Sequence, residues 1–203
     1  MNILVCIPAR DEVKTEFLMS LVTMMQHATI HPEGGLEDLD GIGFNCIRGS
    51  ILPSSRQSLA REALETGVSH TLWIDTDMAF PKDTIHRLVR ADKDVIGINA
   101  RGRRPPYPFL AEATATTRLE TKKDSTGVVQ VHRVGFGLVL IKSSVFRQMS
   151  EPYFAFEWLE DKSSFRGEDY YFCEKARTVG VEFWVDHDLS KQVAHVGDFA
   201  FMP

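Results

Sequence analysis

Two aspartates separated by one residue, Asp75 and Asp77, follow directly after an apolar run of the sequence. Residues 71–74 predict a buried strand, and the carboxyl end of such a strand brings both side chains to one edge of a sheet. Two carboxylates held this close repel each other unless a cation lies between them. Mg²⁺ and Mn²⁺ prefer oxygen ligands, and one such ion can be bound by protein carboxylates and a substrate diphosphate together. The competing interpretation is an ordinary loop in which Asp77 caps the following helix.

A second acidic pair, Glu168 and Asp169, opens a helical pattern over residues 168–179. A carboxylate at this place is able to take a proton from a hydroxyl group, which is the task of a general base. Acidic residues in a first helical turn also complement the helix dipole, a structural role worth about 0.3 to 1 kcal/mol each. Both interpretations stand for the pair, and the sequence does not separate Glu168 from Asp169 as the base.

Two further positions are candidates for ligand contact. His195 follows the last predicted strand, and imidazole is a competent ligand for manganese; His187, after Asp186, is the alternative. Gly137 belongs to the motif Gly135-Phe136-Gly137 at the start of a predicted strand, where a glycine lets the backbone approach a sugar or a diphosphate. A simple bulge explains this glycine equally well.

Two segments of the second half combine charge or aromatic rings with irregular sequence. Residues 101–107 hold three arginines and a tyrosine among prolines, a composition suited to a diphosphate or to DNA phosphates, although a solvated loop has the same composition. Residues 153–158 are rich in aromatic side chains. These rings either stack on a sugar or base or belong to the core.

The periodicity of apolar residues predicts elements that alternate along the chain. Strands are expected at residues 2–8, 44–47, 71–74, 94–98, 128–134, 136–141 and 182–185, and helices around 17–25, 54–65, 81–89, 143–149 and 168–179. The segments 128–134 and 136–141 are expected to pair with each other. Strands that alternate with helices predict an α/β fold with a mixed, mainly parallel sheet flanked by helices.

Composition limits the class of protein. A chain of 203 residues with 43% hydrophobic and 25% charged residues is long enough for one globular domain and is not disordered. Its net charge of −5 provides no general attraction to nucleic acid, so a polyanion must bind a local patch. Three widely spaced cysteines fit no disulfide framework. Short apolar runs and the lack of a signal peptide predict a cytoplasmic protein with no membrane partner.

Two stretches of the first half resemble the GT-A glycosyltransferases. Residues 55–57 and 72–81 resemble the family's arginine-bearing helix and the metal-binding acidic motif that follows it. Residues 6–12 resemble the first strand and nucleotide-binding loop, with Asp11 where an asparagine is frequent. The resemblance implies a single Rossmann-like GT-A domain in which residues 1–100 bind the nucleotide sugar and residues 101–203 bind the acceptor and carry the catalytic half.

The same resemblance implies a role for individual residues. Transfer of a sugar with inversion from a nucleotide-diphosphate donor, here a UDP-sugar, to an acceptor hydroxyl is the expected reaction. The donor would contact Pro8, Ala9, Arg10, Arg56, Asp75 and Gly137; Mn²⁺ or Mg²⁺ would bind Asp75, Asp77 and His195; and Asp169 would be the base.

Two other functions compete with this one. A nucleotidyltransferase of related fold should carry a glycine-rich phosphate loop after its first strand, and residues 8–13 contain no glycine. A nucleotide-sugar-binding module without catalysis has no need of both Asp169 and His195. The chain also resembles small phage-encoded enzymes, which would act in the infected host cytoplasm. The expected acceptor is therefore a hydroxymethylated DNA base, with a small molecule or a protein as the competing choice.

Overall fold

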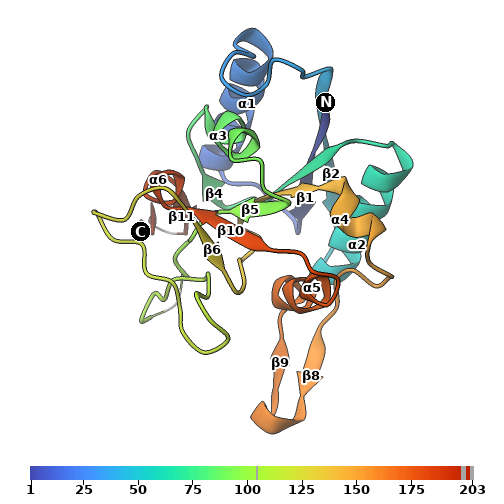
Figure 1. Ribbon diagram of the computed structural model, residues 1–203, viewed down its shortest axis with the longest axis vertical. Coiled ribbons are helices and arrows are strands. Elements are labelled where there is room, and N and C mark those ends of the chain that lie inside the picture. The colour runs from blue at the N-terminus through green and yellow to red at the C-terminus, as the bar shows by residue number, and fades with distance from the viewer. Residues whose placement is uncertain (104, 198–199, 202–203) are drawn as a thin grey trace.

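A computed structural model describes residues 1–103, 105–197 and 200–201 (Figure 1). Its central sheet has seven strands in the order β2-β1-β3-β7-β5-β10-β6. Pairing is parallel for β2 with β1, β1 with β3 and β5 with β10, whereas β7 and β6 run antiparallel to their neighbours. The strands are β1 Asn2–Ala9, β2 Gly41–Arg48, β3 His70–Ile74, β5 Val95–Gly97, β6 Val128–Val131, β7 Leu138–Lys142 and β10 Phe183–Asp186. This mixed, mainly parallel α/β sheet confirms the predicted fold class.

Helices cover both faces of the sheet, as Figure 1 shows. On one face lie α1 (Thr15–Ile30), α3 (Thr84–Arg90) and α6 (His187–Ser190); on the other lie α2 (Leu52–Glu65), α4 (Ser143–Arg147) and α5 (Glu168–Arg177). Successive side chains of β1 point to opposite faces, so Val5 packs under α1 and Cys6 packs under α2. A strand buried on both faces needs the continuous apolar run seen in the sequence. None of the described helices has the length and apolar character needed to span a bilayer.

The predicted pairing of residues 128–134 with 136–141 is wrong. Strand β7 lies between β3 and β5, whereas β6 lies at the sheet edge beside β10. Every residue of β7 except Lys142 is buried, which suits a central strand. Strand β6 has only its last residue, Val131, fully buried, which suits an edge. Short separation along the chain favoured a hairpin, but burial on both faces decided the position of β7.

Two helix starts differ from prediction, while one helix end agrees. Helix α2 begins at Leu52, before the predicted start at residue 54, and has Pro53 in its first turn without a side-chain cap. Helix α3 begins at Thr84, after the predicted start at residue 81, and the Thr84 hydroxyl donates a hydrogen bond to the carbonyl of Pro81 at 2.6 Å. The end of α2 at Glu65 agrees with the predicted range, and Gly67, with φ of +70°, follows it.

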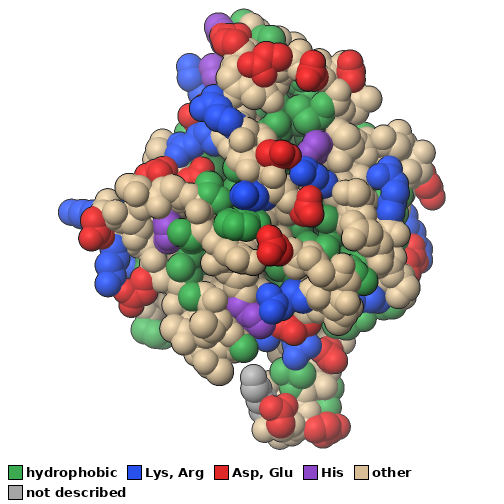
Figure 2. Space-filling view, in the orientation of Figure 1, with side chains coloured by type: hydrophobic (Ala, Val, Ile, Leu, Met, Phe, Trp, Pro, Cys, Tyr) green, Lys and Arg blue, Asp and Glu red, His purple; other side chains and the backbone are tan. Residues whose placement is uncertain are grey.

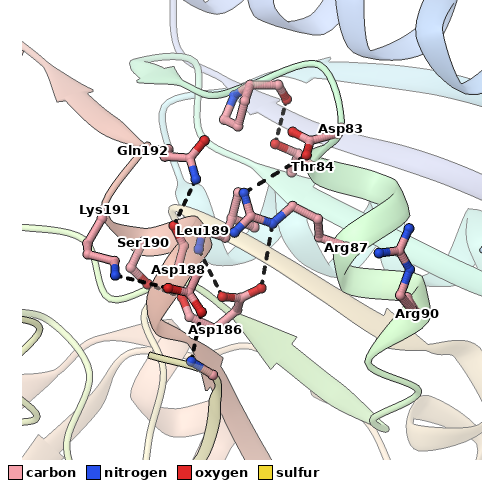
Figure 3. Close-up of polar contacts among 12 residues, drawn as sticks. Asp83, Thr84, Arg87, Arg90, Asp186, Asp188, Leu189, Ser190, Lys191 and Gln192 are labelled. Atoms are coloured by element: carbon pink, nitrogen blue, oxygen red, sulfur yellow. Dashed lines mark hydrogen bonds and ion pairs between the residues drawn. The ribbon is translucent and has the colours of Figure 1, made fainter. Parts of the chain in front are cut away.

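A small second sheet, which the sequence analysis missed, has the strand order β12-β11-β4. Strands β4 (Met78–Ala79), β11 (Ala194–Val196) and β12 (Ala200–Phe201) are too short to show a periodic pattern. A polar network holds the segment that leads into β11 (Figure 3). Asp186 Oδ1 accepts a hydrogen bond from the Leu189 backbone at 2.8 Å and so caps α6, and Asp186 Oδ2 lies 3.9 Å from Arg87 Nε on α3.

A hairpin of β8 (Glu157–Leu159) and β9 (Ser164–Arg166) projects from the body of the protein and carries hydrophobic side chains along it (Figures 1 and 2). The aromatic segment 153–158 therefore divides into two parts. Tyr153 and Phe154 are buried in the core, whereas Phe156 and Trp158 are exposed. The core interpretation is correct for the first pair only.

Candidate functional site

The acidic turn after β3 is held by its backbone. The Asp75 N–H donates to the carbonyl of Gly137 at 3.0 Å, and the Met78 N–H donates to the carbonyl of Asp75 at 3.2 Å. These bonds fold residues 75–78 back at the edge of the sheet, so the carboxylates of Asp75 and Asp77 both face one cavity. This is the arrangement expected from a buried strand that ends in two aspartates.

Strand β11 brings His195 to Asp77. Pairing of β11 with β4 sets His195 opposite Met78, and the Val196 N–H donates to the carbonyl of Asp77 at 2.7 Å. As a result, His195 Nε2 lies 3.4 Å from Asp77 Oδ2. Burial lowers the pKa of His195, but the hydrogen bond and charge of Asp77 outweigh burial and raise that pKa overall.

The other ring nitrogen of His195 fixes the orientation of the imidazole. His195 Nδ1 lies 2.8 Å from the carbonyl oxygen of Arg101. Because a carbonyl only accepts, Nδ1 carries the proton, and in the neutral ring Nε2 presents its lone pair toward Asp77. A histidine held in this way by a backbone carbonyl is in the tautomer that binds a metal through Nε2.

Arg103 supplies a positive charge to the same carboxylate. Its Nη1 lies 2.8 Å from Asp77 Oδ2, and its side chain is 48% exposed. Burial raises the pKa of Asp77, but the His195 hydrogen bond and the charges of His195 and Arg103 lower it overall. Asp77 is therefore a carboxylate anion at neutral pH.

The second oxygen of Asp77 is the observation that fits a metal. Asp77 Oδ1 is buried, and none of the described residues donates a hydrogen bond to it. A buried carboxylate oxygen without a donor is costly, and a hard cation is a suitable partner. Within the described part of the chain, however, no three His, Cys, Asp or Glu side chains are grouped closely enough to hold a metal. Asp77 and His195 are in contact, whereas Asp75 faces Arg56.

Arg56 is the buried centre of the site. Its side chain is 2% exposed, with Nη2 2.8 Å from Asp75 Oδ1 and Nη1 3.0 Å from Glu168 Oε1. The guanidinium lies over the Phe136 ring, 4.9 Å from its centroid. Burial raises the pKa of Asp75, and the charge of Arg56 opposes that rise. Arg56 was expected to contact the donor; it does not line the cavity that Asp75 and Asp77 face, and its guanidinium pairs with Asp75 instead.

A cavity of about 330 Å³, here the Asp77 cavity, opens in front of the acidic turn. Its volume is within the usual range for small-ligand sites. Pro8 and Ala9 at the end of β1 and Arg10 directly after it form one wall of this cavity. Gly49 and Ser50, after β2, line it too. Sequence reasoning missed these two, although the rule that ligands bind beyond the carboxyl ends of parallel strands points to them.

A second cavity of about 490 Å³, here the Asp169 cavity, lies at the start of helix α5, beside the second residue of the acidic pair Glu168 and Asp169. Asp169 and Tyr170 line it together with Arg166 of the hairpin. Burial raises the pKa of Asp169, and the charge of Arg56 opposes that rise. Glu168 is 7% exposed and paired with Arg56, so it does not line this cavity. The structure therefore distinguishes two residues that the sequence left equivalent.

Three remaining candidates lie elsewhere or cannot be placed. Gly137 is not in the wall of the Asp77 cavity; a Cβ there would meet the sulfur of Met78 at 3.3 Å, so close packing under the turn explains the glycine. His187 is buried with Nδ1 2.9 Å from Thr121 Oγ1, away from the acidic turn. Arg104 lies outside the described residues.

Comparisons with known proteins find likeness in fold alone. The sequence matches no family model and no curated protein. Among solved structures, A197 from STIV is similar with a TM-score of 0.66 and 15% identity over 100% of this chain and 91% of that chain. GalNAc-T7, solved with UDP, GalNAc and Mn²⁺, is similar with a TM-score of 0.60 and 12% identity over 97% of this chain and 44% of that chain. The mixed sheet flanked by helices thus has the GT-A, Rossmann-like arrangement that the sequence predicted.

Proposed function

We propose that the protein is a metal-dependent glycosyltransferase that moves a sugar from a nucleotide-diphosphate donor, a UDP-sugar, to an acceptor hydroxyl with inversion. The observation that carries the proposal is a pair of cavities: Asp75, Asp77 and His195 line one, Asp169 lines the other, and Arg56 joins Asp75 to Glu168, the neighbour of Asp169. Similarity in fold to GalNAc-T7, which was solved with UDP and Mn²⁺, supports the choice of donor and cation. The one-domain division into residues 1–100 for the donor and 101–203 for the acceptor is part of the same proposal.

In the Asp77 cavity the residues would hold the donor. Pro8, Ala9 and Arg10 line the nucleotide side, while Asp77 Oδ1 and His195 Nε2 would hold Mn²⁺ or Mg²⁺, with Asp75 turning from Arg56 to join them. A bound divalent cation supplies positive charge to the departing diphosphate.

In the Asp169 cavity the acceptor would lose its proton. Asp169 would accept the proton of the hydroxyl as that oxygen bonds to the anomeric carbon and the bond from this carbon to the diphosphate oxygen breaks. A raised pKa makes the carboxylate a stronger base than an exposed aspartate, which favours this role near neutral pH. Inversion requires the base and the departing diphosphate on opposite faces of the sugar, so this proposal assigns the acceptor to the Asp169 cavity and the diphosphate to the Asp77 cavity.

The donor half of the proposal is tested by thermal shift. UDP and a set of UDP-sugars should raise the melting temperature with Mn²⁺ far more than without it, because a ligand stabilises the state it binds. Asp77→Ala should abolish Mn²⁺-dependent donor hydrolysis and this shift, whereas Asp94→Ala, which removes an exposed carboxylate that pairs with Lys142 and lines neither cavity, should retain both. Wild-type behaviour of Asp77→Ala would refute the metal assignment.

For the acceptor we propose a hydroxymethylated base in DNA, with a small molecule or a protein as the alternative. A hydroxyl on a methylene group is a suitable nucleophile for the Asp169 cavity, and arginines and an aromatic ring line that cavity. Transfer of glucose from UDP-glucose to DNA containing hydroxymethylcytosine, measured by mass spectrometry of the nucleosides, tests it. Donor hydrolysis without any transfer to this DNA would leave the enzyme class intact and remove the acceptor.

A further inference from the structure

A large basic cavity, here the basic groove, lies beside the Asp169 cavity and shares no described lining residue with the Asp77 cavity. It has a volume of about 730 Å³, and four cations line it: Arg101, Arg118, Lys122 and Lys123. Glu120 is the one carboxylate among the described residues of its wall. This concentration of positive charge occurs in a chain with a net charge of −5, so it is a local feature and not a reflection of overall composition.

The cations of the basic groove have few internal partners. No carboxylate of a described residue forms an ion pair with Arg118, whose Nη1 donates only to the carbonyl of Phe109. Lys122 pairs with Glu120 at 3.0 Å, an interaction between two largely exposed side chains that is weak in water. Arg101 stacks on Phe109, with 3.9 Å between the guanidinium carbon and the ring centroid. These charges remain available to an anionic ligand.

The groove continues into the Asp169 cavity through Arg118, which lines both. Across the Asp169 cavity stands the projecting hairpin, whose Phe165 also lines it and is 67% exposed. Phe165 meets Trp158, 46% exposed, with ring centroids 5.0 Å apart. Positive charge, a candidate base and exposed aromatic rings therefore follow one another along a single surface.

This order matches the chemistry of a single strand of nucleic acid. Proteins bind such strands by cations that follow the phosphates and by aromatic side chains on which bases stack. A neutral glycan carries no charge that would pair with the lysines, and an acidic peptide carries no bases that would stack on the exposed rings. A hydroxyl on a base within a duplex cannot reach Asp169 below the cavity rim unless that base leaves the stack.

We infer that the acceptor binds as an unpaired strand, with its phosphates along the basic groove and its hydroxyl-bearing base between Asp169 and the hairpin rings. The inference rests on the proposed function because it assigns Asp169 as the base. It adds that the strand is held unpaired and identifies the side chains that hold it.

The charge part is tested by fluorescence anisotropy with a labelled single-stranded oligodeoxynucleotide at several salt concentrations. The double variant Lys122→Ala, Lys123→Ala should weaken binding and reduce the slope of log affinity against log salt by about 1.4, or about 0.7 for each phosphate that is no longer neutralised. A control with Lys82→Ala and Arg177→Ala removes two charges outside the groove and should keep the wild-type slope. Equal slopes in both double variants would overturn the inference.

The stacking part uses the hairpin. Phe165→Ala should weaken binding of the strand about tenfold or more, as expected when one base no longer stacks. Phe44→Ala removes a ring of similar exposure (58%) on edge strand β2 and should have no effect. Phe165→Tyr should bind as the wild type does, because tyrosine retains the stacking face. Wild-type affinity of Phe165→Ala would overturn the placement of the base against the hairpin.

Three results separate this inference from the proposed function. Tighter binding of the single strand than of the matching duplex supports it. Equal binding of duplex and single strand overturns the unpaired mode. Absence of oligonucleotide binding, with an intact Mn²⁺-dependent thermal shift by UDP-sugars in the same preparation, overturns the inference and points to a protein or small-molecule acceptor while the transferase assignment stands. Strand binding without any such shift would instead contradict the proposed function.

Discussion

Arg103→Ala should change metal affinity and donor affinity in opposite directions. Arg103 Nη1 lies 2.8 Å from Asp77 Oδ2, so the guanidinium provides the positive charge that a divalent cation would bring to the same carboxylate. Removal of Arg103 leaves Asp77 with a stronger need for a cation. In the proposed Mn²⁺ complex, the same guanidinium would instead donate to the diphosphate of the donor, and the variant would lack that hydrogen-bond donor.

The magnitude follows from the geometry. Two unit charges about 4 Å apart interact by about 4 kcal/mol at an effective dielectric constant of about 20. Arg103 is 48% exposed, and exposed ion pairs contribute only about 0.2 to 1 kcal/mol. A value between these limits, about 1.4 kcal/mol, corresponds to a change of about tenfold in affinity. We expect Mn²⁺ to bind Arg103→Ala about tenfold more tightly, and UDP to bind its Mn²⁺ complex about tenfold more weakly.

Isothermal titration calorimetry measures both quantities: Mn²⁺ added to nucleotide-free protein, then UDP added at saturating Mn²⁺. Arg10→Ala is the control for the first, since Arg10 lines the same cavity but pairs with Asp11 and not with Asp77. Its Mn²⁺ affinity should equal that of the wild type. Unchanged or weaker Mn²⁺ binding by Arg103→Ala would refute the idea that guanidinium and metal compete for Asp77.

Three further predictions concern the carboxylates and their partners. Asp169→Asn should bind UDP and Mn²⁺ normally but fail to transfer the sugar, measured by single-turnover kinetics; an absence of donor binding in the folded variant would argue against a base. Arg56→Ala leaves the buried Glu168 and the half-buried Asp75 without their cation, so scanning calorimetry should show a loss of about 3 to 5 kcal/mol, or about 6 to 20 °C in Tm, whereas wild-type stability would mean that these ion pairs do not form in solution. Because Asp77 raises the pKa of His195, protonation of His195 stabilises the fold below its ordinary pKa, and this contribution disappears as pH rises through the raised value. Mn²⁺ must displace that proton, so its affinity should fall from about pH 8 to about pH 6, and His195→Gln should flatten the dependence.

The sequence predicted most of the central sheet because its strands are long apolar runs separated by helical patterns. It also located the first wall of the Asp77 cavity and the acidic turn, since both follow directly after such strands. The prediction failed where position depends on contacts distant in sequence. The insertion of β7 between β3 and β5 is one case, because burial on two faces is decided by partner strands far away along the chain.

The site itself shows the same limit. The contact between His195 and Asp77 depends on pairing of two very short strands, β4 and β11, which have no periodic signal. The sequence identified Arg56 as a candidate residue on a predicted helix. Only the structure shows that its side chain is buried and pairs with Asp75 and Glu168. The sequence could not distinguish exposed aromatic rings from core aromatics in this segment. Phe154 and Phe156 are the same residue type and differ only in burial.

The segment that begins at Arg101 and ends at Phe109 lines both the Asp77 cavity and the basic groove. Its two ends pair with each other, and the Gly102 N–H donates to the carbonyl of Pro108 at 2.8 Å, so the loop is a closed unit. Arg103 extends from it to Asp77, the Arg101 carbonyl holds His195, and the Arg101 side chain lines the basic groove. If a ligand on one side shifts this unit, affinity on the other side changes, and linkage then requires the two effects to be equal in free energy. Occupancy by strand, nucleotide and cation would then be cooperative, a property arising from one short loop.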